Sequence, residues 1–318
     1  MKYFFIRLLF FIFLIASSIS AKTISSNQNN PIFSEIIGLR KNGNFDEAIK
    51  IIDKYFLANL EIPYTDRYHL ELNLGVLYWN SGNILESQRR YLAAYRLEKL
   101  IPRSSIVSNF CHNAILIVDL YNKAKEARDS RFFPQSKSLF FEAIAISKKI
   151  LSPEHEAKCL RQLSLVYWYE NDLHMFGLLN NECLNIARQL NLFKDTSICL
   201  NNLGLYCYKN EDYISALKYF EESLSISQKN KYFQSESECL TNLGVLHKDI
   251  GNYEFALSCF NRALEIDKKY FGNDYISNDI NNIGTIYRKL GLLSFDDNYF
   301  SISLKYFLNS LELLTPAY

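Results

Sequence analysis

Apolar residues recur along most of the chain at intervals of three and four, the spacing of a helix that buries one face. One such stripe occupies positions i, i+3, i+4 and i+7 of a single segment: Leu200, Leu203, Gly204 and Cys207. After a polar break at 210–212, the same spacing returns with Ala216, Phe220, Ser223 and Leu224. The pattern predicts two amphipathic helices joined by a short polar turn.

This pattern of helix, turn and helix returns along the chain with a constant period. The first helix carries a glycine at the same place in three copies, Gly204, Gly244 and Gly284. In two copies the second helix carries an alanine followed by a phenylalanine, Ala216 with Phe220 and Ala256 with Phe260. Self-similarity at a fixed period is typical of arrays in which each unit packs against its neighbours. We therefore predict a row of helix hairpins, whose small residues let the two helices of a hairpin approach closely.

The small residues on both helices, with rings between them, resemble the tetratricopeptide repeat. That repeat usually has about 34 residues, whereas the spacing here is 40, which is similar to kinesin light chains. The resemblance implies an all-α fold, a right-handed superhelical solenoid of about seven helix hairpins with the first helices lining its concave face.

Seven units account for nearly all of residues 32–318. We place them near residues 32–60, 66–99, 104–150, 154–190, 195–228, 235–268 and 275–314. From the third unit on, the turns between helices are expected at one constant spacing, at Arg131, Asn171, Glu211, Gly251 and Gly291. The third unit holds about nine extra residues between Ser104 and Ser130, and the seventh about seven between Leu292 and Asn298.

The first residues differ in kind from the repeats. Lys2 and Arg7 precede an uncharged run from Leu8 to Ala16, and small residues follow up to Ala21. This layout is typical of a secretory signal peptide over residues 1–21, with an uncleaved membrane anchor as the alternative. Residues 22–31 are polar and predict a disordered tether. We therefore expect an exported protein, in the periplasm, in the envelope or secreted, or one anchored to the membrane by this segment.

Composition narrows the range of functions. The formal net charge of the 318 residues is +1, so bulk electrostatics favour no nucleic-acid partner. The five histidines are scattered, and the sequence contains no HExxH, Walker loop or GxSxG motif. These observations predict no catalytic residues, no cofactor and no metal, and thus a protein that is not an enzyme.

Three cysteines, Cys159, Cys199 and Cys239, share one place in successive units. Equivalent places in stacked hairpins are too far apart for a disulfide, so we expect small apolar residues packed between hairpins. An alternative is a disulfide between Cys183 and Cys199, which export would permit.

The resemblance implies that residues two before the glycine place face the concave side. They are mostly asparagines: Asn73, Gln162, Asn202, Asn242 and Asn282. An amide there can donate to and accept from the backbone of an extended peptide; the alternative is that it caps or bridges adjacent helices. The family pattern adds rings and cations at neighbouring places: Lys158, Arg161, Trp168, Tyr208, Lys209, Lys248 and Arg288. These suit an acidic peptide with apolar anchors.

The leading hypothesis is an exported, non-enzymatic scaffold that binds an extended peptide or protein partner in its concave groove. One alternative is the extracytoplasmic sensor region of a larger signalling receptor or kinase. Another is a structural subunit of an envelope assembly. The last helix is also expected to expose some of Leu304, Phe307, Leu308 and Leu311, which would permit self-association.

Overall fold

The computed structural model describes residues 31–59, 61–107 and 109–314. The predicted signal peptide and nearly all of the predicted tether lie outside these residues. Within them the chain forms fourteen α-helices and two short 3-10 helices, and no strand. None of these helices combines the length and the apolar character needed to cross a bilayer. The predicted all-α class is confirmed.

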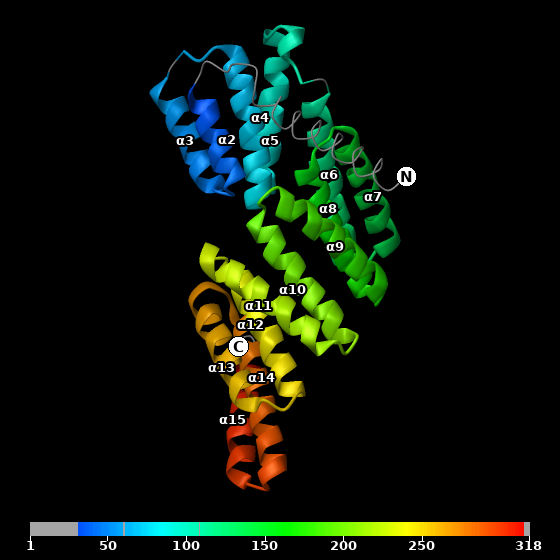
Figure 1. The fold of residues 1–318 in the computed structure, drawn as a ribbon, viewed down its shortest axis with the longest axis vertical. Coiled ribbons are helices and arrows are strands. Elements are labelled where there is room, and N and C mark those ends of the chain that lie inside the picture. Colours follow the sequence, from blue (N-terminus) through cyan, green and yellow to red (C-terminus); the bar gives the residue numbers. More distant parts are fainter. Residues whose placement is uncertain (1–30, 60, 108, 315–318) are drawn as a thin grey trace. The chain divides into compact units, whose positions relative to one another are not determined.

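The helices pair into seven consecutive hairpins (Figure 1). The first four are α2 (Pro31–Lys41) with α3 (Phe45–Ala58), α4 (Tyr64–Ser81) with α5 (Ile84–Leu97), α6 (Phe110–Asp129) with α7 (Phe133–Lys149), and α8 (Pro153–Tyr169) with α9 (Leu173–Gln189). The last three are α10 (Phe193–Lys209) with α11 (Tyr213–Asn230), α12 (Phe233–Asp249) with α13 (Tyr253–Tyr270), and α14 (Asn273–Ser294) with α15 (Asp297–Leu314). They form two compact units, which we call unit 1 (up to Leu192) and unit 2 (from Phe193).

The glycines of the first helices sit directly under rings of the second helices. A Cβ atom added at Gly75 would lie 2.3 Å from the Tyr91 ring, and one at Gly204 would lie 2.5 Å from the Phe220 ring. At Gly244 the nearest ring atom, of Phe260, would be 2.6 Å away. Real Cβ atoms do not approach that closely, so the close contact within these three hairpins requires glycine. The prediction about small residues is confirmed.

Most turns follow the predicted spacing. Arg131, Asn171, Glu211 and Gly251 all have positive φ, between 61° and 83°, which ends each first helix in the left-handed region. Three of the following helices begin with a side-chain cap, since Asp172, Asp212 and Asn252 each accept from the backbone N–H three residues on. The polar residues of these turns therefore stop one helix and start the next.

The two irregular units use their extra residues in different ways. Before the third hairpin they begin earlier than the predicted window of 104–130, because the connection from α5 to α6 spans residues 98–109 and contains the 3-10 helices Glu98–Leu100 and Arg103–Ser105. The first helix of this hairpin, α6, has 20 residues. In the seventh unit the extra residues lengthen α14 to 22 residues. The turn predicted at Gly291 is therefore wrong: Gly291 is buried inside α14, and the left-handed residue is Phe295. Helical hydrogen bonds through Gly291 carry α14 on to Ser294, where the chain turns instead.

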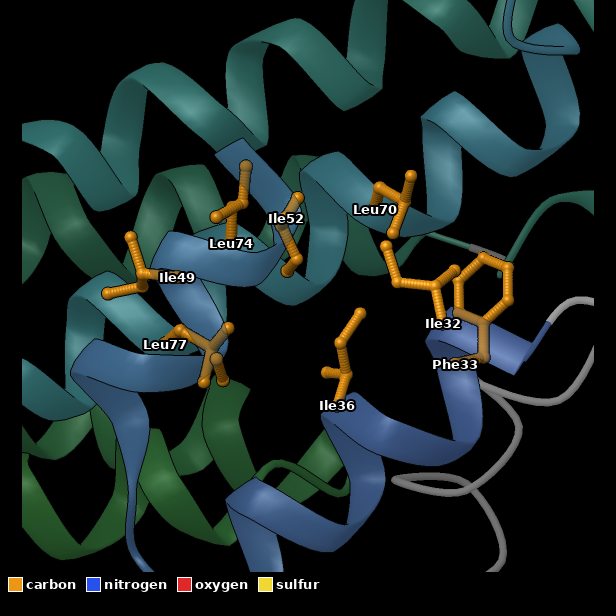
Figure 2. Packing of buried hydrophobic residues seen from close by; sticks show 9 residues of the cluster. Ile32, Phe33, Ile36, Ile49, Ile52, Leu70, Leu74 and Leu77 are labelled. Carbon is orange, nitrogen blue, oxygen red and sulfur yellow. The ribbon is translucent and has the colours of Figure 1, made fainter. Parts of the chain in front are cut away.

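The first hairpin begins the core of unit 1. Figure 2 shows Ile32, Phe33 and Ile36 of α2 against Ile49 and Ile52 of α3 and against Leu70, Leu74 and Leu77 of α4. Ile36, Ile52 and Leu74 have no exposed surface. The first helix of each hairpin thus packs between its own second helix and a neighbouring hairpin, as the repeat pattern predicts.

Candidate peptide-binding surface

In unit 2 one side of each first helix remains open. Between Gln234 and Lys248 on α12, every side chain is buried except six: Gln234, Glu238, Thr241, Asn242, Val245 and Lys248. Five of them follow one another at spacings of four and three along one face of the helix. We call the inner stripe these five places (234, 238, 241, 245 and 248) together with the equivalent places one repeat earlier on α10 and one repeat later on α14.

Of the five rows of the inner stripe, the three nearest the C-terminal ends of the helices differ in chemistry. The row at 201, 241 and 281 consists of hydrogen-bonding side chains: Asn201, which is buried, Thr241, which is partly exposed, and Asn281, which is exposed. The next row, Leu205, Val245 and Thr285, is partly exposed and mostly apolar. The row near the C-terminal ends of the helices contains Tyr208, Lys248 and Arg288. Apolar side chains therefore lie one helical turn from a ring and two cations.

Hydrogen bonds join the first helices of unit 2 to one another. Asn242 Nδ2 on α12 donates to Asn201 Oδ1 on α10 at 3.0 Å, and Thr241 Oγ1 donates to Asp279 Oδ1 on α14 at 3.1 Å. Asn242 thus bridges adjacent hairpins, which was the alternative to a free peptide-binding amide. Of the other two predicted amides in this unit, Asn202 is buried and Asn282 is partly exposed.

Charged and aromatic side chains lie beside these hydrogen bonds, near the C-terminal ends of α10 and α12. The Tyr208 hydroxyl donates to Asp249 Oδ2 at 2.5 Å, and Lys248 Nζ lies 3.4 Å from Asp249 Oδ1. Lys209 lies over the Tyr208 ring, with its Nζ 5.8 Å from the centroid. Burial, together with the hydrogen bond to Asp249, raises the pKa of the Tyr208 hydroxyl. The predicted residues Tyr208, Lys209 and Lys248 are therefore brought together, and Arg288 is exposed on α14.

A buried pair of carboxyl groups lies behind the stripe. Asp267 of α13 is 2% exposed and Asp279 of α14 is 1% exposed, and Asp267 Oδ1 and Asp279 Oδ2 have no hydrogen-bond partner among the described residues. Burial, and then the charge of Asp267, raises the pKa of Asp279 to about 7. Burial also raises the pKa of Asp267. Because both pKa values are raised, the pair keeps a proton to a higher pH than two exposed carboxyls would.

Sequence reasoning missed this pair, although a signal was present. Asp279 occupies the place in its unit that Cys159, Cys199 and Cys239 hold in the three preceding units. All three cysteines are buried. An acid at a place that packs between hairpins is the irregularity that could have indicated a perturbed carboxyl group.

In unit 1 the corresponding predicted residues bond within the protein. Asn73 donates through Nδ2 to the carbonyl of His69 at 2.7 Å and accepts at Oδ1 from Arg40 Nη1 at 3.0 Å. Gln162 Oε1 accepts from Arg128 Nη1. Lys158 Nζ donates to the carbonyl of Trp79 and lies 5.4 Å from the centroid of the Trp79 ring. The other two predicted residues of unit 1, Arg161 and Trp168, are partly exposed. Trp168 packs against Phe176, with the ring centroids 4.9 Å apart.

These bonds belong to a wider contact between hairpins that are not neighbours in sequence. Helix α4 contacts α8 across unit 1. Arg40 Nη2, at the end of α2, is 3.1 Å from Glu154 Oε1 at the start of α8. The Trp79 indole N–H donates to the carbonyl of Glu154 at 3.1 Å. Unit 1 therefore closes its inner side with its own side chains.

His155 lies at the centre of this contact. Its ring stacks on Trp79 with centroids 4.6 Å apart, its Nδ1 is 2.6 Å from Ser152 Oγ, and its Nε2 is 3.2 Å from the Tyr91 hydroxyl. Burial, and then the charge of Lys158, lowers the pKa of His155 to about 3. A fully buried, neutral histidine with both nitrogens occupied is a structural group.

The cysteines pack as small apolar residues. All seven are thiols, and six of them are buried, including Cys183 and Cys199. Cys183 donates to the carbonyl of Ala157 at 3.1 Å, and Cys239 to that of Phe220 at 3.0 Å. Burial raises the pKa of Cys239 to about 12. The pairing of Cys183 with Cys199 is not formed here and stays a prediction. Among the described residues, no group of three or more acidic, histidine or cysteine side chains is placed to hold a metal ion.

Models of the tetratricopeptide repeat match two parts of the chain, residues 196–230 and residues 237–270, which are the fifth and sixth hairpins. Among curated protein sequences, none matches the chain. Solved structures of similar fold include three that share most of this chain. BtubC (BKLC) from P. vanneervenii is 17% identical, with a TM-score of 0.54 over 75% of this chain and 94% of that one. A Rap protein complexed with competence and sporulation factor is 14% identical, with a TM-score of 0.53 over 93% and 78%.

The third is a signal transduction ATPase with numerous domains from Pyrococcus horikoshii, which has a tetratricopeptide-repeat sensor. It is 15% identical, with a TM-score of 0.53 over 88% of this chain and 41% of that one. At these identities the likenesses show a common fold of stacked helix hairpins.

Proposed function

Because two of the seven hairpins match models of the tetratricopeptide repeat, we propose that unit 2 binds an extended peptide or protein segment along its inner stripe and that the protein acts as a scaffold without catalysis. The observation that carries the proposal is the open side of α10, α12 and α14, where the apolar row lies one turn from the row of Tyr208, Lys248 and Arg288. A Rap protein of similar fold has been solved with competence and sporulation factor bound, which supports the same class of function.

The chemistry of the rows defines the partner. The apolar row receives aliphatic or aromatic side chains of the peptide, and the cations of Lys248 and Arg288 attract an acidic one. The hydrogen-bonding row contributes little, because Asn201 already accepts from Asn242 and Thr241 already donates to Asp279. Unit 1 contributes little to peptide binding in this proposal, since Asn73, Gln162 and Lys158 are engaged within the protein.

A displayed library of random peptides provides the test. Selected sequences are expected to combine apolar and acidic residues. Val245→Asp and Lys248→Glu should each weaken a selected peptide about tenfold, measured by fluorescence polarisation, because they remove an apolar contact and reverse a charge. Lys218→Glu, on the exposed face of α11, is the matched control and should leave affinity unchanged. Equal affinity for Val245→Asp and the parent protein would refute the inner stripe as the binding surface.

Export is a separate part of the proposal. It is supported by the charge and apolar pattern of residues 1–21. N-terminal sequencing of the protein after expression in a host with a secretion pathway should show cleavage after Ser20 or Ala21. An intact N-terminus in a membrane fraction would favour the anchored alternative, and an intact N-terminus in the cytosol would contradict both.

The sensor role remains the second candidate. The solved ATPase with a tetratricopeptide-repeat sensor matches 88% of this chain, so an array of this size occurs as a sensor region. In that case the peptide bound on the inner stripe is the signal, and the same affinity measurements apply.

A further inference from the structure

The last helix, α15, leaves one flank of apolar side chains open. Leu304, Leu308 and Leu311 are 59%, 53% and 59% exposed, and Phe300 is 36% exposed. Their spacing of four, four and three residues places them along one side of the helix. The buried side of α15 is different: Ser303 Oγ donates to the carbonyl of Gly284 at 2.8 Å, and Phe307 packs over Gly284. Of the four apolar residues of which some were expected to be exposed, Leu304, Leu308 and Leu311 are exposed and Phe307 is partly buried.

The same flank is covered in the preceding hairpin. Phe307 lies over Gly284 as Phe260 lies over Gly244, so Leu304 and Leu311 of α15 correspond to Leu257 and Leu264 of α13. Those two leucines pack in one cluster with Ile280 and Ile283 of α14. Leu308, by contrast, corresponds to Asn261, which is exposed on α13. The open flank of α15 therefore continues, at Leu304 and Leu311, the surface by which one hairpin of unit 2 packs on the next, and Leu308 widens its apolar area.

We propose that a second copy of this chain covers this flank, with the two α15 helices packed antiparallel about a two-fold axis. An antiparallel pair centred near Leu308 brings Leu304 of one copy opposite Leu311 of the other. Lys305 and Glu312 border the stripe near its two ends. The same pairing therefore places Lys305 beside Glu312 of the second copy, and each charge pair occurs twice by symmetry.

Stacking of α15 on the first hairpin of another copy is the alternative, and it fits less well. The large apolar side chains of α2 are turned inward: Ile32, Phe33 and Ile36 are buried, and Ile37 and Leu39 are partly buried. A head-to-tail contact would thus place the leucines of α15 on a face without a matching apolar stripe. It would also extend into open-ended chains, whereas an α15 pair closes at two copies.

The test is sedimentation of the full chain over a range of concentrations, with two kinds of variant. We expect a dimer with a dissociation constant of micromolar order. Leu308→Lys should raise that constant on the order of 100-fold, because one apolar contact is lost from each copy. Asn309→Lys adds the same charge to α15 outside the stripe and should leave it unchanged. Far-UV circular dichroism checks that both variants fold, and Leu304→Lys serves as a second variant of the stripe.

A charge swap tests the antiparallel arrangement. Lys305→Glu should weaken the dimer about tenfold by placing like charges opposite each other, and the double variant Lys305→Glu, Glu312→Lys should restore it. A chain that stays monomeric at all concentrations would overturn the proposal. A dimer whose dissociation constant does not change in Leu308→Lys would also overturn it, because such a dimer must form through another surface. Assemblies that keep growing with concentration would overturn it as well. Peptide binding on the inner stripe of α10, α12 and α14 involves other residues and is measured separately.

Discussion

Units 1 and 2 are built from the same kind of hairpin but differ in what covers the inner side of the first helices. In unit 1, α4 contacts α8, and Arg40 of the first hairpin reaches Glu154 of the fourth, 114 residues away. In unit 2, the first helices are bridged between neighbouring hairpins, by Asn242 to Asn201 and by Thr241 to Asp279. The inner side is therefore filled by the protein itself in unit 1 and left open in unit 2.

The comparison shows that one repeat pattern can build a structural centre or a binding surface. The amides at corresponding places, Asn73 in unit 1 and Asn242 in unit 2, both bond to other side chains. What differs is the row beyond them. Trp79, one helical turn after Gly75, is buried against His155, whereas Lys248, one turn after Gly244, remains partly exposed. Closure of the hairpins over one another decides which of these groups meet solvent.

The largest expected effect is the loss of the centre of unit 1. Trp79→Ala removes a fully buried ring, its stacking on His155 and its hydrogen bond to Glu154. We expect the free energy of unfolding of unit 1 to fall by about 3–5 kcal/mol. Urea denaturation followed by circular dichroism should then show an early transition that the parent protein lacks.

A matched variant within unit 1 separates loss of this centre from loss of any large ring. Trp168→Ala, at the other tryptophan, removes a partly exposed ring. It should therefore lower the free energy of unfolding of unit 1 markedly less than Trp79→Ala does. Equal losses for the two tryptophan variants would show that Trp79 holds no special position in unit 1.

The second expected effect is a pH dependence confined to unit 2. The pKa of Asp279 is about 7 in the folded protein, well above its ordinary value, because the carboxyl is buried and faces Asp267, with Ser237 and Thr241 of α12 as the other partners of the pair. Below the ordinary pKa of an aspartate, the Asp279 carboxyl is protonated in both the folded and the unfolded state. The buried pair then does not lower the free energy of unfolding. As pH rises towards 7, the unfolded state releases a proton that the folded state keeps, so stability falls.

We expect the free energy of unfolding of unit 2 to decrease by roughly 2–4 kcal/mol between about pH 4 and pH 7.5. Asp279→Asn should flatten that dependence, because it removes the titrating group while preserving the shape of the side chain. Chemical denaturation at a series of pH values provides the measurement. A variant with the same slope as the parent protein would contradict the role of this pair.

The smallest expected effect on stability concerns the hydrogen bonds between the first helices of unit 2. Asn242→Ala removes a partly exposed hydrogen bond to Asn201 and should lower the stability of unit 2 by about 0.5–1.5 kcal/mol. Asn261→Ala, on the exposed side of α13, should change it by less than about 0.5 kcal/mol.

The same variant sharpens the assignment of Asn242. If this amide serves mainly to bridge α10 and α12, Asn242→Ala lowers stability but alters peptide affinity only slightly. A loss of peptide affinity much larger than the loss of stability would instead restore the hypothesis that it reads the peptide backbone.

Much of the fold follows from local pattern. The glycines at 204 and 244, the rings at 220 and 260 and the turns at 131, 171, 211 and 251 are all predicted by the repeat and present in the structure. They concern contacts within a hairpin or to the next one, and such contacts recur with the period of the sequence. The turn at Gly291 was not predicted correctly, because the lengthened α14 continues through it.

The sequence by itself thus determined the hairpins, their number and the residues over which their helices meet. Tertiary structure alone decided what the inner residues do. Contacts such as Arg40 with Glu154 join hairpins that are not adjacent and arise from small rotations summed over several units, so they leave no periodic signal. The charge state of Asp279 likewise depends on Asp267 of another helix and on burial from water, neither of which is a property of the local sequence.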